Sequence, residues 1–524
     1  MFRSPYPDET IPAVSIFDFL FGDLTPDDAQ RIALVDGTSG AETTYGALKQ
    51  QSELVAGALA ARGIGIGDVV ALHCPNVPAF ATVFHGILRS GATATTVNAL
   101  YTPEEITIQL RDSKAKMIFT VSPLYTHAHV AAQQVGIPDT HVVVLDGADG
   151  HLDLRGLLAE GKPAPDVTFD PATHVAVMPY SSGTTGIPKG VQLSHTNLVA
   201  NVVQTYPVLD VTSEDRVLAL LPFTHIYGMT VLLNIALKKR ATLVTMPKFD
   251  LAEFLRIIQD EKCTYLFIAP PIAVALAKHP MVDEYDLSNV RAILSGAAPI
   301  DHGLMSAVAT RLKTRMRQGY GMSEASPVTH VHPPERDDLS MGSIGVPIAN
   351  VEAKLVNVET GAEIDAPAEG QSEPGELWVR GPNVMLGYLG QADATAETID
   401  ADGFLHTGDI ATVGSQGEFY IVDRLKELIK YKGYQVAPAE LEALLLTHPD
   451  ITDAAVVGAL DDDGQEIPKA FVVRREGSDL DGSGVMEFVA EHVAPHKRVR
   501  AVAFIDVVPK SSSGKILRKD LKGK

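Results

Sequence analysis

The residues best suited to chemistry lie in one run, Tyr180-Ser-Ser-Gly-Thr-Thr-Gly-Ile-Pro-Lys-Gly190, which follows an apolar, strand-like segment at 174–178. Its glycines let the backbone approach an anion, its four Ser/Thr hydroxyls can donate to phosphate oxygens, and Lys189 adds positive charge. The run therefore predicts a polyphosphate site. It is not a Walker A loop, because Pro188 precedes the lysine and Gly190 follows it. For the shorter Gly-Thr-Thr-Gly alone, a flexible turn would be the better interpretation.

A second run, Gln318-Gly-Tyr-Gly-Met-Ser-Glu324, offers groups for a nucleotide and a metal ion. The Tyr320 ring can stack on a base, Ser323 can hydrogen bond to a phosphate, and Glu324 suits Mg²⁺, which prefers oxygen ligands and substrate phosphates. Taken alone, the run could equally be a turn that ends a strand. It nearly matches the Gly-x-Ser-x-Gly pattern of serine hydrolases, but Ala325 stands where that pattern needs its last glycine.

Three further residues could contact the rest of a nucleotide or an acid. The Asp409 carboxylate can accept hydrogen bonds from both ribose hydroxyls, and Arg424 can approach the same sugar or a phosphate. In isolation these two would be a solvated turn and a surface arginine. In isolation His225, at a strand end, would be a core histidine rather than a catalytic one.

Lys515 lies in the run Pro509-Lys-Ser-Ser-Ser-Gly-Lys515 and is the strongest single candidate for catalysis. Attack of a carboxylate on the α-phosphorus of a nucleotide brings two anions together, and a positioned ammonium would offset their repulsion. The alternative is a solvated lysine in a basic tail, since the last residues of the sequence contain several other cations.

Taken in order, these runs resemble the motifs of the acyl-adenylate-forming superfamily, which comprises acyl- and aryl-CoA synthetases, peptide-synthetase adenylation domains and luciferases. Further matching runs are Leu221-Pro-Phe-Thr-His-Ile-Tyr-Gly228, Ser295-Gly-Ala-Ala-Pro299, His406-Thr-Gly-Asp409 and Val422-Asp-Arg424. The resemblance covers essentially the whole chain. It implies an enzyme that uses ATP and Mg²⁺ to turn a carboxylic acid into an acyl-adenylate and pyrophosphate.

The resemblance also assigns roles to residues. Lys515, His225 and Glu324 would be catalytic, and Thr184 with Glu324 would hold the metal. The ATP and AMP contacts would come from Ser181, Ser182, Gly183, Thr184, Thr185, Gly186, Lys189, Gly296, Ala297, Ala298, Gln318, Gly319, Tyr320, Gly321, Ser323, Asp409, Arg424 and Lys515. A luciferase-like oxygenation belongs to the same superfamily, but nothing in the sequence points to it.

The segment 426–442 is very close to the 4-coumarate:CoA ligase branch, which implies that coenzyme A accepts the acyl group. By this resemblance CoA would meet Lys248, Lys432, Gly433 and Gln435. Each lysine taken alone is a solvated surface charge. No carrier-protein module follows Lys524, so a tethered carrier is not expected. The C-terminal domain would rotate between the two half-reactions about Asp423 or Lys426.

The same branch implies an acyl pocket that favours cinnamate-type acids. The pocket would be formed by His225, Tyr227, Val231, Leu294, Ala297, Gly319, Pro327, Val328 and Lys430. Leu294 stands where plant members carry a lysine, and Val231 where they carry a serine. Because discrimination for a phenol hydroxyl needs a buried polar partner, unsubstituted cinnamate, other aryl acids and medium-chain fatty acids are alternatives.

The elements that must position these residues follow an α/β pattern. Between about 44 and 295, helical patterns such as 48–62 alternate with short apolar runs such as 69–72, 217–221 and 292–295, which predicts parallel sheets with ligand loops at strand ends. Residues 341–423 alternate in a way that predicts a small β barrel. We therefore expect an N-terminal domain, 1–423, and a mobile α+β domain, 424–524.

Composition limits the remaining possibilities. The net charge of −22 argues against binding to nucleic acid or to anionic membranes, since both need a basic surface. Cys74 and Cys263 are too few for a disulfide framework or a thiolate metal site, and no apolar run suits a signal peptide or a membrane helix. These features predict a cytoplasmic enzyme. The alternative outside enzymes is a non-catalytic protein that binds an acyl-nucleotide or CoA.

Overall fold

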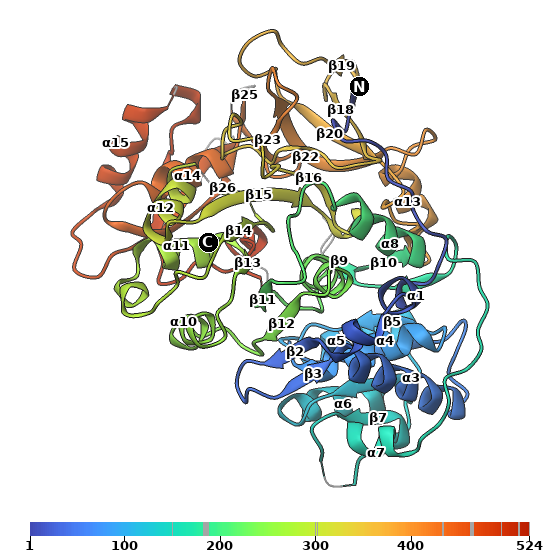
Figure 1. Ribbon diagram of the computed structural model, residues 1–524. Helices are drawn as coiled ribbons and strands as arrows, with labels where there is room; N and C mark the ends of the chain where they lie inside the picture. Colours follow the sequence, from blue (N-terminus) through green and yellow to red (C-terminus); the bar gives the residue numbers. More distant parts are fainter. Residues whose placement is uncertain are drawn as a thin grey trace.

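The computed structural model describes residues 1–148, 150–181, 188–298, 300, 302–431, 434–461, 466–493, 495–511 and 514–522. In this part of the chain the strands form three large sheets and two small ones. In Figure 1 the sheets of the N-terminal residues lie below, the middle of the chain lies above them, and the C-terminal residues lie to the left. The α/β class predicted from the sequence is confirmed.

The first sheet has the strand order β21-β10-β8-β5-β4-β6-β7, with β9 paired to β10. Strands β4 to β8 pair in parallel, whereas β10 pairs with its neighbours in antiparallel. The bounds are β4 Val69–His73, β5 Thr93–Thr96, β6 Met117–Thr120, β7 Val142–Val144, β8 Val175–Val177, β9 Tyr180–Ser181, β10 Lys189–Ser194 and β21 Gly387–Tyr388.

The second sheet has the order β17-β16-β15-β14-β13-β11-β12-β2-β3. Its strands from β2 to β15 are parallel, so their carboxyl ends meet at one edge. The bounds are β2 Ile32–Asp36, β3 Glu42–Thr44, β11 Arg216–Ala219, β12 Thr242–Thr245, β13 Tyr265–Ile268, β14 Ala292–Ser295, β15 Arg315–Gly321, β16 Val328–Val331 and β17 Val346–Pro347.

Helices cover both of these sheets. They are α1 Ile16–Phe21, α2 Pro26–Gln30, α3 Tyr45–Ala61, α4 Pro78–Arg89, α5 Pro103–Ser113, α6 Tyr125–Val135, α7 Leu154–Ala159, α8 His195–Gln204, α9 Ile235–Lys238, α10 Leu251–Asp260, α11 Pro270–Lys278 and α12 His302–Leu312. Several begin at side-chain caps. Thr102, for example, accepts from the Glu105 N–H while the Glu105 carboxylate accepts from the Thr102 N–H, which stabilises the first turn of α5.

One large apolar core joins the first two sheets and reaches the third. It contains Phe80 and Phe84 of α4, Phe223, Phe267 of β13 and Phe419. A second apolar cluster packs α10, α11 and α12 against the other face of the second sheet. Both faces of this sheet are therefore covered, as its almost uninterrupted apolar strands require.

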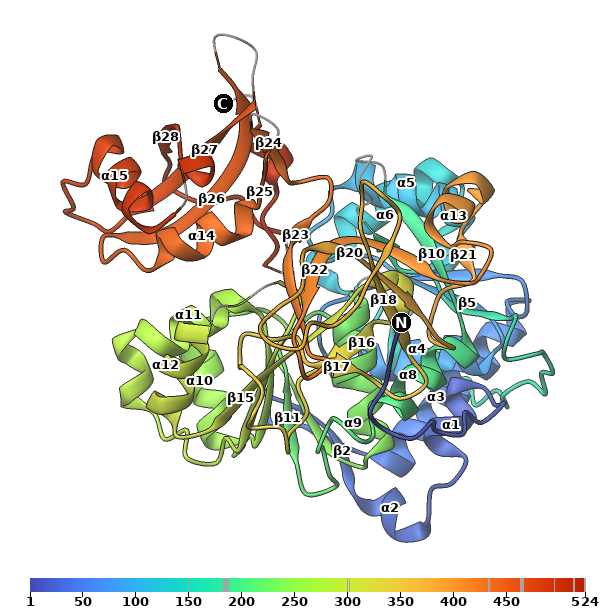
Figure 2. The same cartoon turned by 90° about the horizontal axis from the view of Figure 1, so that it is seen from above.

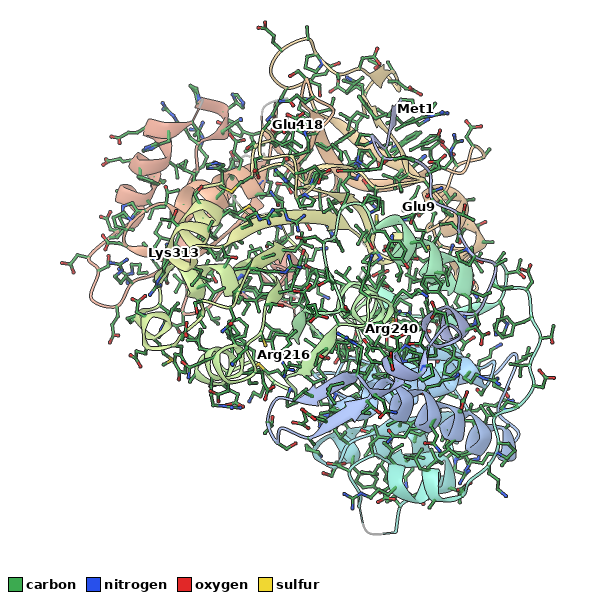
Figure 3. The ribbon with its side chains drawn as sticks, viewed as in Figure 1. Met1, Glu9, Arg216, Arg240, Lys313 and Glu418 are labelled. Carbon is green, nitrogen blue, oxygen red and sulfur yellow. The ribbon has the colours of Figure 1, made fainter. Side chains whose placement is uncertain are left out.

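The third sheet has the order β1-β18-β20-β22-β23, with β19 paired to β18. The bounds are β1 Phe2–Arg3, β18 Glu352–Val356, β19 Glu363–Ile364, β20 Gly375–Arg380, β22 Leu405–Val413 and β23 Phe419–Arg424, and the helix α13 spans Ala392–Thr398. On this sheet the ring of Trp378 stacks on that of His406, 3.6 Å between centroids. Met1 and Glu418, labelled in Figure 3, both lie beside it.

This sheet differs from the small β barrel predicted for residues 341–423. Among the described strands the hydrogen bonds follow an open path, because the edge of β18 is taken by β1 and that of β23 only by a bridge from Phe419 to Gly345. The N-terminal residues were not expected here, since a two-residue strand carries no sequence pattern. Likewise β21 lies within 341–423 but belongs to the first sheet.

The residues after β23 form a smaller α+β unit, seen beside the rest of the chain in Figure 2. The bounds are β24 Ile429–Tyr431, β25 Tyr434–Val436, α14 Pro438–Leu446, β26 Ile451–Leu460, β27 Glu466–Arg474, α15 Gly482–His492 and β28 Ala501–Phe504. The unit has an apolar core of its own, in which α14 and α15 pack on β26 and β27. None of the helices described here or above is both long and apolar enough to cross a bilayer.

Short helices complete the fold. The segments η1 Ser122–Leu124, η2 Asp139–His141, η4 Pro280–Glu284, η5 Ser323–Ala325, η6 Pro495–Lys497 and η7 Arg518–Asp520 are 3₁₀ turns. The segment η3, Tyr227–Asn234, is a π-helix and leads directly into α9. π-Helical turns are rare and gather at functional sites, and η3 begins two residues after His225.

Candidate active site

One group of the predicted site residues lies at the carboxyl ends of the parallel strands of the second sheet. The strand β14 ends at Ser295, and β15 ends at Gly321. Ligands of α/β proteins bind at this edge, because the loops that leave the strands gather there. Besides Tyr320, which is described below, the predicted nucleotide contacts at these two strand ends are Gly296, Ala297, Ala298, Gln318, Gly319, Gly321 and Ser323.

The two ends of the phosphate-binding run are neighbours. The strands β9 and β10 pair with Ser181 opposite Lys189 and Tyr180 opposite Gly190. The Tyr180 hydroxyl donates to Asp112 Oδ2 at 2.6 Å, which ties the start of the run to α5. The predicted residues Ser182, Gly183, Thr184, Thr185 and Gly186 lie outside the described part of the chain.

Glu324 lies against this pair of strands. Its side chain is almost fully buried, and its Oε1 accepts from the Ser181 hydroxyl at 3.1 Å and from the Tyr388 hydroxyl at 3.0 Å. The ammonium of Lys189 lies 4.7 Å from the centroid of the Tyr388 ring. A carboxylate, a hydroxyl and a cation from three segments thus meet at one place.

Asp409 and Arg424 face each other across the antiparallel strands β22 and β23. Asp409 Oδ2 accepts from the Tyr320 hydroxyl at 2.5 Å, and the Arg424 Nε lies 3.5 Å from Asp409 Oδ1. Burial raises the pKa of Asp409, although Arg424, Tyr320 and Lys515 oppose that change. Asp409 therefore links the nucleotide-binding run of β15 to the last strand before the C-terminal unit.

Lys515 reaches this cluster from the C-terminal unit. The preceding Gly514 has φ +82°, and a Cβ there would stand only 3.2 Å from Pro271 at the start of α11. Glycine thus permits both the left-handed backbone and the close approach of this loop to the second sheet. Within the loop, the Lys515 N–H donates to the Ser511 hydroxyl and the Ser511 N–H to the Lys515 carbonyl.

The surroundings of Lys515 lower its pKa to about 8. Burial is the main cause and the positive charge of Arg424 the next, while Asp409, Glu427 and Glu324 act in the opposite direction. Among the described residues no carboxylate forms an ion pair with its ammonium. The lysine is charged at neutral pH, close to acidic groups but not neutralised by a direct partner.

His225 lies close enough to Lys515 for the two charges to interact. Part of the residue is exposed to solvent. Desolvation by the surrounding protein, and then the positive charge of Lys515, lower the pKa of the imidazole to about 4. Its Nδ1 lies 3.3 Å from the Tyr227 backbone N–H, which donates to it. The neutral ring must then carry its proton on Nε2, so this atom is a hydrogen-bond donor.

The predicted acyl residues of the described chain lie around η3, at the carboxyl ends of β14 and β15, and at the start of β16. The Tyr227 ring covers Gly296, where a Cβ would come within 2.8 Å of the ring, and its hydroxyl donates weakly to the Leu294 carbonyl at 3.4 Å. Val231, Leu294, Pro327 and Val328 are buried, whereas Gly319 is half-buried. Ala297 is exposed with φ +73°, a strained conformation of the kind that gathers at ligand sites.

The predicted CoA and hinge residues lie further out. Lys248 is exposed after β12, beside the exposed ring of Phe249. Lys432 and Gly433 lie outside the described residues, and the side chains of Lys430 and Gln435 are not described either. Asp423 is buried, and its carboxylate accepts from the N–H groups of Arg424 at 2.6 Å and Ala439 at 2.9 Å. Lys426 is exposed.

Two contributors were not foreseen from the sequence. Tyr388 contacts both Glu324 and Lys189, but it comes from a two-residue strand with no motif of its own. Glu427 lies near Lys515 and Asp409 while the Arg518 guanidinium binds its carboxylate. An acidic residue inside a basic segment was the only available signal for it. In the described part of the chain no three acidic, His or Cys side chains could hold a metal by themselves.

Two family descriptions match the sequence. Residues 26–389 match the family "AMP-binding enzyme", and residues 440–515 match "AMP-binding enzyme C-terminal domain". Together they span both the strand-end cluster and the unit that carries Lys515.

Named relatives and solved structures agree with this match. The chain is 41% identical to 4-coumarate–CoA ligase 3 of Oryza sativa subsp. japonica over 534 residues, 100% of this chain and 95% of that protein. It is 41% identical to 4-coumarate–CoA ligase 1 of Solanum tuberosum, covering 100% of this chain and 96% of that one. ATP-bound MatB from Rhodopseudomonas palustris has a TM-score of 0.88 at 28% identity, covering 97% of this chain and 98% of that one.

Proposed function

This chain belongs to the AMP-binding enzyme family, and we propose that it is an ATP-dependent acyl-CoA ligase acting on an aryl-propenoic acid. In the first half-reaction a carboxylate oxygen of the acid attacks the α-phosphorus of ATP, and the bond to the β,γ-diphosphate breaks. The products are acyl-AMP and pyrophosphate. In the second, the thiolate of CoA attacks the acyl carbonyl carbon, and AMP leaves with the bonding electrons.

The observation that carries this proposal is the position of Lys515. Its ammonium, without an ion-pair partner in the described residues, lies close to the carboxylates of Asp409 and Glu324 and to His225. In this position it can offset the repulsion between the carboxylate and the phosphate and stabilise charge on the phosphoryl oxygens. The Asp409 carboxylate would hold the ribose hydroxyls, and the Tyr320 ring the base.

Mg²⁺ fits the groups present. Glu324 offers a carboxylate whose Oε1 already accepts two hydrogen bonds, while no donor to its Oε2 is found among the described residues. Magnesium is commonly held by one or two carboxylates together with substrate phosphates and water, so a single protein carboxylate is sufficient. When bound, the metal would neutralise charge on the phosphates. Thr184, the other ligand in this proposal, is supported by the family resemblance alone.

His225 would orient the acid. With a pKa of about 4 it is neutral at pH 7, and with Nδ1 occupied by the Tyr227 N–H its Nε2–H can donate to a carboxylate oxygen. A neutral donor holds the acid without forming an ion pair that would weaken the nucleophile. Removal of the Nε2–H donor is expected to disturb the orientation of the bound acid more than the phosphoryl transfer itself.

The second half-reaction needs a different arrangement. Because Lys515 comes from the C-terminal unit, we propose that residues 424–524 rotate as a domain relative to 1–423, about Asp423 or Lys426. The Asp423 carboxylate accepts a hydrogen bond from the Ala439 N–H at the start of α14, so it is suited to anchor the C-terminal domain at this hinge. The proposed CoA contacts are Lys248, Lys432, Gly433 and Gln435, with Lys430 near the acid.

The acid is proposed from the relatives and from the pocket. The plant proteins to which this chain is 41% identical are named for 4-coumarate. Leu294, Val231 and Val328 leave the pocket largely apolar, which favours an unsubstituted ring over a phenol. A benzoate-type acid or a medium-chain fatty acid is the second candidate within the same reaction.

A panel of acids tests the proposal. Cinnamic, 4-hydroxycinnamic, benzoic and octanoic acids would each be incubated with ATP, Mg²⁺ and CoA, and thioester and pyrophosphate would be measured. We expect cinnamic acid to give the largest kcat/KM. If octanoate formed a thioester while every aryl acid was inactive, the aryl-propenoic assignment would be wrong. Pyrophosphate release that did not depend on an added acid would contradict the ligase itself and favour a non-catalytic binding protein.

Location and partners complete the proposal. Both cysteines are free and buried, which suits a reducing cytoplasm. The partners are the small acid, ATP and CoA rather than nucleic acid, a membrane or a tethered carrier domain.

A further inference from the structure

The Tyr388 side chain contacts two groups of the proposed ATP site at once. Its hydroxyl donates to Glu324 Oε1 at 3.0 Å, and the ammonium of Lys189 lies 4.7 Å from the centroid of its ring. One residue thus supports both the carboxylate that suits a divalent cation and the cation that suits a phosphate.

The backbone around Tyr388 is tied to the same two segments. Tyr388 is paired with Val191 in β10, and the Leu389 N–H donates to the Gly190 carbonyl at 2.8 Å. On the other side the Met385 N–H donates to the carbonyl of Glu324 at 2.8 Å. Residues 385–389 therefore join the phosphate-binding strand to the turn that carries Glu324.

The backbone of Tyr388 is also held by residues at the start of α13. Its N–H donates to the Thr395 hydroxyl at 2.9 Å, and that hydroxyl donates to the Gln391 carbonyl at 2.9 Å. Gly387 has φ +143°, and a Cβ there would lie 2.8 Å from Thr395 Cγ2, so α13 packs directly on this strand. The ring has little freedom to move away from Lys189.

We propose that Tyr388 is a positioning residue that aligns Glu324 and Lys189 for one metal-bound triphosphate, an inference that rests on the proposed function. Together with Ser181, its hydroxyl occupies Oε1 of the carboxylate and leaves Oε2 for the cation. Its ring holds the lysine by a cation–π contact, which orients the ammonium without cancelling its charge as a carboxylate would. Both effects favour a triphosphate with a bound metal.

The hydroxyl remains a donor under the conditions of the reaction. The ordinary pKa of a tyrosine phenol is about 10, so the phenol keeps its proton at neutral pH. Loss of the hydroxyl would free the carboxylate to rotate, while loss of the ring would free the lysine. The two functions can therefore be separated by substitution.

Tyr388→Phe and Tyr388→Leu separate them. ATP binding would be measured by calorimetry with and without Mg²⁺, in the absence of acid. Tyr388→Phe should keep metal-free ATP affinity and lose roughly 3- to 10-fold of the gain that Mg²⁺ gives, which is the net contribution of one ordinary hydrogen bond. Tyr388→Leu should weaken ATP binding under both conditions.

Kinetics supply a second readout. With Tyr388→Phe the Mg²⁺ concentration for half-maximal pyrophosphate release should rise, while kcat at saturating Mg²⁺ should return close to the parent value. A purely structural role would lower kcat at every Mg²⁺ concentration and would lower the midpoint of thermal unfolding. Tyr420→Phe is the matched control, because that hydroxyl donates to Glu418 on the third sheet, away from the site.

Two outcomes would overturn the inference. Either Tyr388→Phe binds ATP with the same Mg²⁺ dependence as the parent, or it loses metal-free and metal-bound affinity equally. The binding measurement also separates this inference from the proposed function. If the parent protein binds Mg²⁺·ATP but releases no pyrophosphate with any acid, the ligase assignment fails while the role of Tyr388 is still decided by calorimetry.

Discussion

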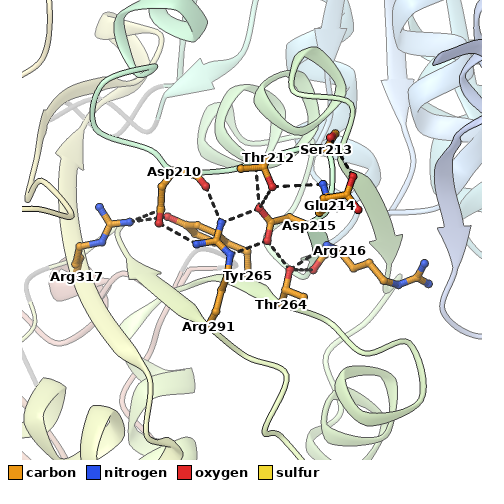
Figure 4. Close-up of polar contacts among 10 residues, drawn as sticks. All are labelled: Asp210, Thr212, Ser213, Glu214, Asp215, Arg216, Thr264, Tyr265, Arg291 and Arg317. Atoms are coloured by element: carbon orange, nitrogen blue, oxygen red, sulfur yellow. Dashed lines mark hydrogen bonds and ion pairs between the residues drawn. The ribbon is translucent and has the colours of Figure 1, made fainter. Parts of the chain in front are cut away.

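Charged side chains gather at both ends of the strands of the second sheet, and those at the amino ends are paired with one another. At the amino ends of its strands, acidic and basic side chains saturate one another, as Figure 4 shows. Near the carboxyl ends, the Lys515 ammonium from the C-terminal unit has carboxylates nearby but no ion pair among the described residues. Lys189 of the neighbouring strand β10 lies against the ring of Tyr388. The same residue types thus serve the fold at one end and are left available to a ligand at the other.

The amino-end network has a defined geometry. Arg291, which precedes β14, binds both oxygens of Asp215 at 2.8 and 2.7 Å and also binds Asp210 at 2.8 Å. Arg317 of β15 binds the other oxygen of Asp210 at 2.8 Å and the Tyr265 hydroxyl at 2.9 Å. Burial alone would raise the pKa of Asp215, but its hydrogen bonds, first from Arg291, lower it. Every charge in this group has a direct partner.

The two ends of this sheet differ in whether their charged side chains have direct partners. Arg291 and Leu294 are three residues apart, at opposite ends of β14. A charge with a complete set of partners is expected to contribute to stability, and a charge without one to contribute to binding or chemistry. Substitutions at the two ends should therefore affect different quantities.

The largest expected effect is at the carboxyl end. Lys515→Ala should lower the rate of acyl-AMP formation by about 10²–10³-fold, because it removes the cation that stabilises the transferred phosphoryl group. Pyrophosphate release in the presence of acid measures this step. Lys519→Ala is the matched control, since Lys519 is exposed in the same C-terminal segment. Equal losses in the two variants would show that the general charge of the tail, not Lys515, matters.

The amino end should respond in stability and not in rate. Asp215→Ala removes a buried carboxylate and leaves Arg291 with one acidic partner fewer, which should cost about 2–3 kcal/mol in the free energy of unfolding. Denaturant unfolding measures this cost, and the folded enzyme should keep its kcat. Asp283→Ala breaks the exposed contact to Arg311 and should cost less than about 1 kcal/mol. A large loss of kcat in folded Asp215→Ala would show that this network contributes to the reaction and not only to stability.

The rate of acyl-AMP formation should also depend on pH through Lys515. The pKa of Lys515 is lowered to about 8, so the ammonium is present below that pH and is lost above it. The rate of acyl-AMP formation should therefore fall toward tenfold per unit as the pH rises beyond about 8. Single-turnover measurements between pH 6 and 10 would follow it. A rate that stayed level to pH 10 would mean that the lysine keeps its ordinary pKa.

The smallest effect is expected at the acyl pocket. Leu294→Gln keeps the approximate size of the side chain and adds polar groups, which should raise the ratio of kcat/KM for 4-hydroxycinnamate over cinnamate by about tenfold. Competition between the two acids measures this ratio directly. Leu276→Gln is not a suitable control because it would disturb the core, whereas the exposed Leu460→Gln should leave the ratio unchanged.

Much of this arrangement could be predicted from the sequence, because it depends on local pattern. The apolar runs at 69–72 and 292–295 form the strands β4 and β14. The α/β class, the family and the ligase reaction followed from ordered motifs. The positions of site residues on strand ends followed from the rule for parallel sheets, while their individual roles stay predictions.

The remainder depends on pairings between distant segments, which leave little trace in sequence. Two-residue strands such as β1 and β21 have no periodicity, so neither the edge partner of the third sheet nor Tyr388 could be found. Because β1 takes the edge of β18, the described strands form an open sheet where a barrel was predicted, and a two-residue strand gives no pattern that would show this. The network around Arg291 joins the 210–215 loop to Tyr265 of β13 and Arg317 of β15, and no motif specifies it.

The stack of Trp378 on His406 has a practical consequence for optical work. The sequence contains one tryptophan, so the intrinsic indole emission of the protein arises from a single position. Its stacking partner precedes Asp409 by three residues on β22 and lies 3.4 Å from an oxygen of Asp400. The natural chain thus contains a built-in fluorophore beside the strand that would hold the ribose, without any added label.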